Sequence, residues 1–239
     1  WDDAFLDAAE AGDHGETLWF WESPAPFVVI GYGQQRLREV DVEACESAGV
    51  PVLRRCSGGG AVVQGPGCLN YGLILGIEES GPTGSITGTN HHVMERNRRA
   101  LAGLLTHPVA IRGHTDLARV TGGGELKFSG NAQRRRRTHL LFHGTFLLHF
   151  DLPLAARFLK FPSLAPEYRR GRSHDAFIAN THLEPGSVKD ALRREWGVTT
   201  PVRLPREERM RAALEARYAR AVAYSRRPDY DRALGLMDS

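Results

Sequence analysis

Apolar and polar positions follow two periods along the chain, and these separate expected strands from expected helices. Residues 17–21 and 27–31 are aromatic and β-branched runs bounded by Pro24 and Pro26, which predicts two strands. The same signal predicts further strands at Pro51–Leu53, Ala61–Gln64, Leu69–Leu75, Leu126–Gln133 and His139–Phe150. The last two are expected to pair through the basic turn 134–137.

A helical period marks the other segments. Residues 90–105 place Val93, Asn97 and Leu101 on one side, so a central helix is expected there. Further helices are expected at Asp3–Ala11, Val42–Ala48, Val188–Trp196 and Glu207–Tyr224, with a loop at Phe161–His174. The strands come mostly in consecutive runs, which favours an α+β fold: a mixed, largely antiparallel sheet with packed helices.

Composition narrows the class of protein without naming a function. The chain has 239 residues, 41% of them apolar, and no apolar run approaches the length of a membrane span. We therefore expect one domain over residues 1–239, and neither a disordered nor a membrane-spanning chain. The net charge of +3 is too mild to indicate nucleic-acid binding. Three cysteines without a paired framework, and no leader-like segment, predict a cytoplasmic protein.

The first candidate for chemistry is a glycine triplet between two expected strands, in residues 54–62. Three successive glycines allow the backbone to approach a ligand, and their N–H groups can surround an anion. Arg55 could add a two-pronged contact to that anion. The alternative is a flexible hairpin turn in solvent. The motif is not a P-loop, since no Gly-Lys-Ser/Thr follows it.

The second candidate is the expected strand around Lys127, one of three lysines among 31 basic residues. Alternation predicts that Lys127, Ser129 and Asn131 share one face and that Phe128 points to the other. A lysine on an inner sheet face is costly unless it meets an anion such as a carboxylate, a phosphate or their mixed anhydride. The alternative is an edge strand whose lysine points to water.

The third candidate is residues 142–148. Gly144 permits close approach of another backbone, and His143 and Thr145 could hydrogen-bond a substrate, although a histidine in an apolar strand is more often structural. His139, His143 and His149 do not have the spacing of a standard metal site, so no zinc is expected.

Together the three stretches resemble the lipoate–protein ligase A family, within the biotin/lipoate ligase superfamily. The likeness follows one order along most of the chain. Its motifs are Phe5-Leu6-Asp7-Ala8-Ala9, Val28–Gln35, Arg54-Arg55-x-Ser57-Gly58-Gly59-Gly60-Ala61-Val62, Asp116-Leu117, Lys127–Gln133, His143-Gly144-Thr145 and Tyr168-Arg169-x-Gly171-Arg172-x-His174. Any one of these motifs would be a weak signal, whereas their joint occurrence is strong.

The resemblance implies a reaction, its cofactors and its partners. Such enzymes activate the carboxyl group of lipoic acid with ATP and Mg²⁺, and transfer the acyl group from lipoyl-AMP to a lysine. The acceptor is a lipoyl domain of a 2-oxoacid dehydrogenase or the glycine cleavage H protein. By the same resemblance Lys127 is the catalytic residue, touching the carboxylate and the α-phosphate. The implied substrate- and ATP-binding residues are Arg55, Ser57, Gly58, Gly59, Gly60, Ala61, Val62, Val63, Asn70, Asp116, Ser129, Gly130, Asn131, Ala132, His143, Gly144 and Thr145. Mg²⁺ would come with the ATP phosphates.

Two departures from the family pattern matter. Gln64-Gly65 stands where the family usually has His-Asp, and the following Pro66-Gly67 is similar to related octanoyltransferases. The chain also ends where fuller members continue into an accessory domain, so a separate accessory protein is expected.

Two alternative functions and one expectation about a loop stay open. An octanoyltransferase acting from acyl carrier protein would need an activated thiolate, which Cys45, Cys56 and Cys68 supply poorly. A binding module could use the arginines 134–137; we expect these to steer an acidic lipoyl domain rather than RNA. A mobile loop at 119–125, with three glycines, could close over the ligand.

Overall fold

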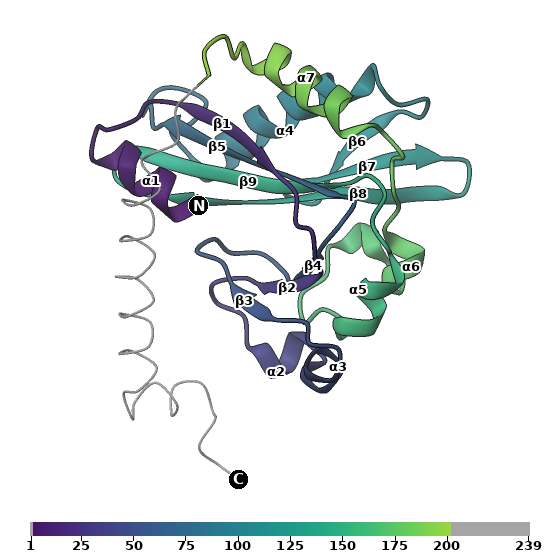
Figure 1. Ribbon diagram of the computed structural model, residues 1–239. Helices are drawn as coiled ribbons and strands as arrows, with labels where there is room; N and C mark the ends of the chain where they lie inside the picture. Colours follow the sequence, from purple (N-terminus) through teal and green to yellow (C-terminus); the bar gives the residue numbers. More distant parts are fainter. Residues whose placement is uncertain (1, 202–239) are drawn as a thin grey trace, which may run out of the picture.

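The computed structural model describes residues 2–201, so the helix expected at 207–224 lies outside the described residues. A six-stranded antiparallel sheet crosses the described part of the molecule, in the order β1-β5-β9-β8-β7-β6 (Figure 1). Its strands are β1 (Thr17–Trp21), β5 (Cys68–Gly76), β6 (Val109–Arg112), β7 (Asp116–Thr121), β8 (Gly124–Arg135) and β9 (His139–Leu147). The expected pairing of β8 with β9 is confirmed.

A second, smaller sheet has the order β3-β2-β4. Its strands are β2 (Phe27–Ile30), β3 (Val52–Arg54) and β4 (Val62–Gln64). Strand β2 runs parallel to β3 and antiparallel to β4. The glycine triplet lies between β3 and β4, so the loop that joins these two strands carries the candidate anion-binding backbone.

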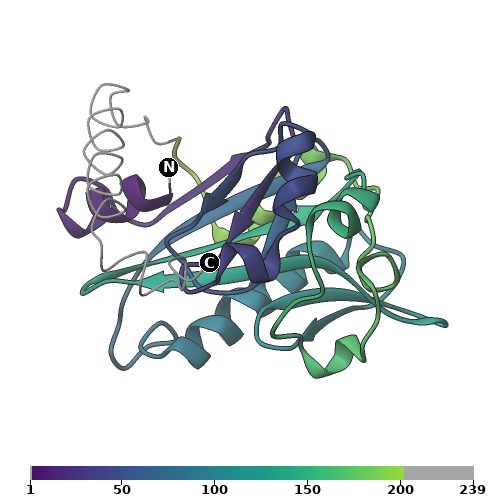
Figure 2. The ribbon, with the colours of Figure 1, turned by 90° about the horizontal axis from the view of Figure 1, so that it is seen from below.

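Helices lie on both faces of the large sheet (Figures 1 and 2). One face carries α4 (Ile86–Ala102) and α7 (Pro185–Trp196). On the other side lie the small sheet and the remaining helices: α1 (Asp2–Glu10), α2 (Arg36–Glu39), α3 (Val42–Ser47), α5 (Pro153–Phe158), α6 (His174–Phe177) and the 3₁₀ helix η1 (Glu167–Arg169). The α+β fold class is therefore confirmed.

Alternating side chains of β5 and β9 fill two separate apolar layers. Leu73 and Phe142 are partners in the β5–β9 register and pack in the cluster that contains Val93 and Met94 of α4. The next pair in the same register packs with Phe5 and Leu6 of α1; it consists of Ile74 and Leu141. Both faces of these strands are buried, which explains why residues 69–75 are apolar almost throughout.

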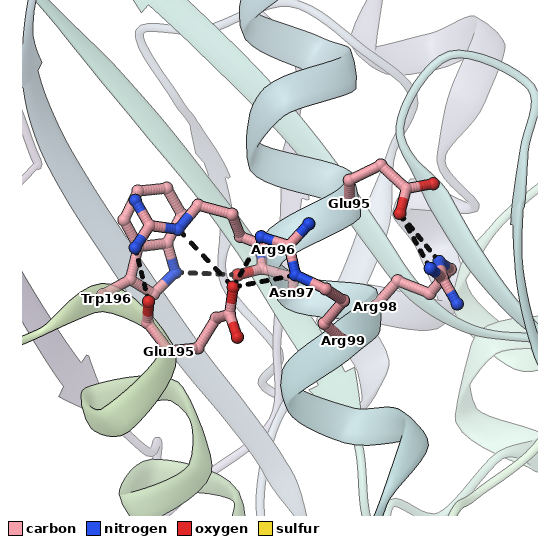
Figure 3. Close-up of polar contacts among 7 residues, drawn as sticks. All are labelled: Glu95, Arg96, Asn97, Arg98, Arg99, Glu195 and Trp196. Atoms are coloured by element: carbon pink, nitrogen blue, oxygen red, sulfur yellow. Dashed lines mark hydrogen bonds and ion pairs between the residues drawn. The ribbon is translucent and has the colours of Figure 1, made fainter.

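Helices α4 and α7 are joined by charged and aromatic contacts (Figure 3). The guanidinium group of Arg96 lies 4.2 Å from the centroid of the Trp196 ring and donates to the backbone oxygen of Glu195. Arg99 donates to the carboxylate of Glu195 over 2.7 Å, and Trp196 Nε1 donates to Asn97 Oδ1 over 3.1 Å. Figure 3 shows these contacts gathered at the last turn of α7.

A buried chain of hydrogen bonds continues from this junction to β8. Asn97 Nδ2 donates to the hydroxyl oxygen of Tyr71, and that hydroxyl donates to Asn131 Oδ1, both over 2.7 Å. A Cβ on Gly144 would collide with Asn131 Oδ1, so the glycine makes room for this side chain. The chain fixes β8 against α4 through polar contacts inside an apolar core.

The sequence predicts no strands where β6 and β7 lie, and it predicts a loop where the structure has the β7–β8 hairpin. Strands β6 and β7 carry charged residues such as Arg112 and Arg119, which hide the strand period. The segment 119–125, expected to be a mobile loop, instead contains the end of β7, a tight turn at Gly122 and Gly123, and the start of β8. Pairing with neighbouring strands overrides the local glycine signal here.

The carboxylate of Glu10 ties α1 to the turn between β8 and β9. It accepts hydrogen bonds from the backbone N–H of Thr138 over 2.8 Å and of His139 over 2.7 Å, and from the Thr138 hydroxyl. Burial opposes ionisation of Glu10, but these hydrogen bonds outweigh it and lower its pKa to about 2. The ionised carboxylate therefore stabilises the folded state.

We predict that Glu10→Gln lowers the free energy of unfolding above pH 4.5 and that the difference from the wild type disappears as the pH falls towards 2. The sign follows from the lowered pKa, because the folded state binds its proton only after the unfolded state has done so. Urea unfolding across this pH range measures the effect, with exposed Glu79→Gln as the control. A difference that is independent of pH would contradict the assignment.

Candidate functional site

Lys127 is held on the sheet face that looks towards the small sheet. Its Nζ lies 2.7 Å from Asp116 Oδ1, and the side chains of the two residues are 25% and 13% exposed. A Cβ built on Gly130 would lie 2.9 Å from Lys127 Nζ, so the ammonium group passes over a position that has no side chain. The result is a half-buried cation beside one carboxylate, close to solvent and able to meet an anion.

A register shift decides which residues share this face. The β7–β8 pairing shifts between Leu117 and Ala118, because two residues of β8 oppose one position of β7. Phe128 packs in the core beside α4 and α7, while Asn131 points to that same side through its bond with Tyr71. The predicted common face of Lys127, Ser129 and Asn131 is therefore wrong, because simple alternation fails at a bulge.

Tyr168 completes the surroundings of Lys127. Its hydroxyl donates to Asp116 Oδ2 over 2.8 Å, and its ring packs 5.1 Å from that of Phe177. Burial and the neighbouring Asp116 carboxylate both raise the pKa of Tyr168, which keeps the phenol protonated as a donor. Tyr168 is absent from the predicted site residues. Its signal in the sequence is the Tyr-Arg-x-Gly-Arg-x-His motif.

The glycine triplet lies against β8. Gly59 has φ +88°, a value that favours glycine, and its Cβ position is 3.8 Å from Cβ of Ala132. Gly31 can carry no side chain, since a Cβ there would collide with the carbonyl oxygen of Gly59. Within residues 2–201, the N–H groups of Gly58, Gly59 and Gly60 meet no protein acceptor, which leaves them available to an anion.

Arg55 donates hydrogen bonds to the exposed triplet, so it is not merely a solvated arginine beside a turn. Its Nη2 donates to the carbonyl oxygens of Gly58 over 2.6 Å and of Gly60 over 2.8 Å, and its Nε also donates to Gly58. Burial lowers the pKa of Arg55 to about 10. The expected two-pronged contact with a ligand anion is replaced by a two-pronged contact with the loop backbone, which orders the N–H groups.

Ser57, His143 and Asp2 form a hydrogen-bonded chain at the base of the triplet. Ser57 Oγ lies 2.5 Å from His143 Nε2, and His143 Nδ1 lies 2.5 Å from Asp2 Oδ2. Burial opposes ionisation of Asp2, but the hydrogen bond with His143 and the positive charges nearby, among them Arg55, together outweigh it and lower the pKa of Asp2. Since both ring nitrogens are engaged, His143 positions Ser57 and α1 in this structure, as the structural reading of this histidine expected.

Most predicted site residues therefore meet on one face, and a few do not. Those that gather around Lys127 and the triplet are Asp116, Gly130, Ala132, Ser57, Gly58, Gly59, Gly60, His143, Thr145 and Asn70. Ser129 and Asn131 lie on the opposite side, where Asn131 Nδ2 donates to Ser129 Oγ. Gly144 makes room for the Asn131 side chain and for the backbone oxygen of Gly130, which would lie 2.9 Å from a Cβ at this position, so the expected close approach of another backbone is confirmed. Ala61–Val63 lead into β4, with Val63 buried in the core of the small sheet.

The three cysteines offer no activated thiol. Cys45 and Cys68 are buried, and Cys56 packs against the cluster formed by α1. Burial raises the pKa of both Cys56 and Cys68 to about 12, and it also raises that of Cys45. A thiol with such a pKa is almost entirely protonated at neutral pH and is a poor nucleophile.

The arginines 134–137 are largely occupied within the protein. Arg135 donates to Thr89 and to the backbone of Thr83, and Arg136 pairs with Asp7 over 3.0 Å. The guanidinium group of Arg134 lies 5.5 Å from the ring centroid of Tyr32. Arg136 and Arg137 are exposed at the β8–β9 turn, so the steering of an acidic lipoyl domain by these arginines stays a prediction.

Two further findings concern the described part of the chain. Between residues 2 and 201, no three His, Cys, Asp or Glu side chains are grouped so that they could hold a metal ion. The helices of that same part are too short or too polar to cross a bilayer.

The fold and this face define a class of protein: an α+β domain in which a glycine loop packs against the strand that carries the half-buried lysine. Residues 1–187 match the lipoyl protein ligase A/B catalytic domain, and the chain belongs to that family. The comparisons thus confirm the resemblance drawn from the motifs.

Relatives in the family include both transferases and ligases. The octanoyltransferase LipM of Symbiobacterium thermophilum is 31% identical over 91% of this chain and 89% of its own length. Lipoate-protein ligase A subunit 1 of Thermoplasma acidophilum is 30% identical over 72% of this chain and 68% of its own length.

Solved structures share the fold. The bi-partite lipoate protein ligase of Thermoplasma acidophilum, studied with its E2 lipoyl domain, has a TM-score of 0.72 at 22% identity, over 100% of this chain and 92% of that one. A lipoate-protein ligase A bound with ATP has a TM-score of 0.65 at 26% identity, over 82% of this chain and 76% of that one.

We predict that no cysteine reacts readily with iodoacetamide in the folded protein at pH 7.5. The raised pKa values of Cys56 and Cys68 imply thiolate fractions at least about 1,000-fold below that of free cysteine. Rates of alkylation followed by intact mass measure this, and the urea-unfolded protein, which should be labelled at all three thiols, is the control. One rapidly labelled cysteine in the folded protein would contradict the prediction.

Proposed function

We propose that this protein activates lipoate or octanoate with ATP and transfers the acyl group to a lysine of a lipoyl domain or of a glycine cleavage H protein. The observation that carries the proposal is the ammonium group of Lys127, held over Gly130 beside Asp116. Gly59 of the triplet packs against Ala132, two residues further along β8, and the N–H groups of the triplet meet no protein acceptor within residues 2–201. This arrangement suits a mixed anhydride of a carboxylate and a phosphate. Membership of the family supports acyl transfer to protein lysines, and the ATP-bound relative supports the nucleotide.

In the first step a carboxylate oxygen attacks the α-phosphorus of ATP and pyrophosphate leaves, giving the acyl adenylate. Negative charge accumulates on the phosphoryl oxygens, where Lys127 and the N–H groups of Gly58–Gly60 can stabilise it. Asp116 holds the ammonium group in place before the anion arrives. Tyr168 in turn fixes Asp116 by hydrogen bonding.

In the second step the ε-amine of the acceptor lysine attacks the acyl carbonyl carbon. The amide forms, AMP leaves and the amine loses a proton. Lys127 stabilises the negative charge on the carbonyl oxygen during the attack. A covalent intermediate on the protein is unnecessary, because the nucleophile belongs to the acceptor.

Mg²⁺ would bind at this site together with ATP, whose phosphate oxygens would supply most of its ligands. Its preferred ligands are carboxylate and phosphate oxygens, and within the described residues Asp116 is the carboxylate paired with Lys127. The ion would neutralise charge on the ATP phosphates, and Asp116 is the residue that would supply a carboxylate oxygen to it. We further propose an accessory protein as partner, on the model of the bi-partite Thermoplasma ligase.

A second candidate is octanoyl transfer from acyl carrier protein. The similarity to the octanoyltransferase LipM, which extends over 91% of this chain, favours it. The buried cysteines with raised pKa speak against an acyl-cysteine intermediate formed by them. The two candidate functions use different acyl donors, so identifying the donor that the protein accepts distinguishes them.

We expect an apo lipoyl domain to gain the mass of one lipoyl group when incubated with this protein and preformed lipoyl-AMP. Parallel reactions contain lipoate, ATP and Mg²⁺, or octanoyl-acyl carrier protein, and intact mass is the readout. Modification from lipoate and ATP indicates a self-sufficient ligase. Modification from lipoyl-AMP but not from ATP indicates that activation needs the accessory protein. Modification from the carrier protein alone would overturn the ligase proposal in favour of the transferase.

We predict that Lys127→Ala lowers the rate of acyl transfer from lipoyl-AMP by about 100- to 1,000-fold, as expected for the loss of a group that stabilises developing charge. Lys189→Ala is the control, since Lys189 of α7 pairs with Glu22, next to the end of β1 and away from Lys127. Both variants should unfold at urea concentrations close to that of the wild type. A folded Lys127→Ala protein with normal turnover would overturn the assignment of the site.

A further inference from the structure

Three polar side chains form a hydrogen-bonded trio at the junction of the two sheets: buried Gln64 and Asn70 and half-buried Thr145. Gln64 Nε2 donates to Thr145 Oγ1, and Thr145 Oγ1 donates to Asn70 Oδ1, both over 2.6 Å. Gln64 is 5% exposed and Asn70 is 3% exposed. The remaining atoms of the two amides, Gln64 Oε1 and Asn70 Nδ2, are buried and have no hydrogen-bond partner among the described residues.

Unpaired atoms of this kind point to a missing partner. More than nine in ten buried polar groups in proteins are hydrogen-bonded, because an unpaired one has lost water without compensation. The trio leaves one acceptor, Gln64 Oε1, and one donor, Asn70 Nδ2. A ligand group that completes it must therefore both donate and accept a hydrogen bond.

The trio lies on the same face of the sheet as Lys127. Asn70 pairs with Thr145, Thr145 with Gly130, and Gly130 with Asp116, so the four positions form one row across β5, β9, β8 and β7. Cross-strand partners present their side chains on a common face. Lys127 Nζ sits over Gly130 in that row, two strand spacings from Asn70, which is about 10 Å.

The chemistry of an activated acyl donor limits what can reach the trio. A saturated acyl chain neither donates nor accepts, and a cyclic disulfide is at most a weak acceptor. Carboxylate and phosphoryl oxygens accept but do not donate. Groups that do both lie on the leaving-group side of the donor. In an acyl adenylate these are the ribose hydroxyls and the adenine edge, and in a carrier thioester they are the amides of the pantetheine arm.

We propose that Gln64, Thr145 and Asn70 recognise the leaving-group half of the activated acyl donor, and that Gln64 is the residue that determines its identity. The inference rests on the proposed function, because it assumes that the anion over Lys127 belongs to such a donor. It gives a role to Gln64, which stands where the resemblance led us to expect histidine. The trio then binds a group that both donates and accepts, at the opposite end of the row from Asp116.

The test compares Gln64→Leu with Gln133→Leu by isothermal titration calorimetry. Gln133 is a matched control because its Oε1 is also buried and unpaired, while its Nε2 binds α4 at Ile86 O and Asn90 Oδ1 on the opposite face. The probes are AMP, S-octanoylpantetheine and octanoate. We expect Gln64→Leu to weaken binding of AMP or of the thioester by about 10- to 100-fold, with octanoate binding unchanged and Gln133→Leu like the wild type.

Each outcome has one meaning. Loss confined to AMP assigns the trio to a nucleotide, and loss confined to S-octanoylpantetheine assigns it to a carrier thioester. Weakened octanoate binding would overturn the proposal by placing the acyl chain at the trio. Unchanged binding of every probe, or a wild type that binds neither AMP nor the thioester, would also overturn it. The readout needs no acceptor protein and no turnover, so its failure is distinguishable from a failure of acyl transfer.

Discussion

The position of the Lys127 ammonium group depends on one irregularity in the large sheet. At the bulge between β7 and β8, two residues of β8 oppose one of β7, and the side chains beyond it change faces. Lys127 therefore lies with Gly130 and Asp116, while Asn131 is left to bond with Tyr71 in the core. In a regular strand Lys127, Ser129 and Asn131 would share one face, and the ammonium group of Lys127 would not lie beside the Asp116 carboxylate.

The site exists because the small sheet is attached to the large one by polar contacts. Ser57, just before the triplet, is hydrogen-bonded to His143, and Gln64, at the end of β4, donates to Thr145. These two contacts fix the segment that contains the triplet to β9. Arg55 then orders the loop through its carbonyl oxygens. Binding of an anion by these N–H groups would cost little loop entropy, since Arg55 already holds the loop.

The relatives include ligases and octanoyltransferases, which differ in their activated acyl donor. The cysteines of this chain help to distinguish the two, because a route through an acyl-cysteine needs a reactive thiol. An acyl-cysteine needs a thiolate, whereas burial holds the pKa of Cys56 and Cys68 near 12. A sheet-borne cation beside an ordered anion site suits direct transfer from an anhydride. The similarity to LipM and the geometry of the site thus favour different donors, and we propose that the residues around Gln64 distinguish between them.

The sequence by itself determined the elements with strong periodicity and the motifs that carry chemistry. Nearly continuous apolar runs located β5 and β9, and the glycine triplet and Lys127 could be recognised because each is unusual for its surroundings. The tertiary structure alone decided which side chains meet. The bulge that turns Asn131 away, the pairing of Lys127 with Asp116 and Tyr168, and the use of Arg55 inside the loop all depend on register and long-range contacts. A local pattern reports only the period of one strand, so it cannot contain that information.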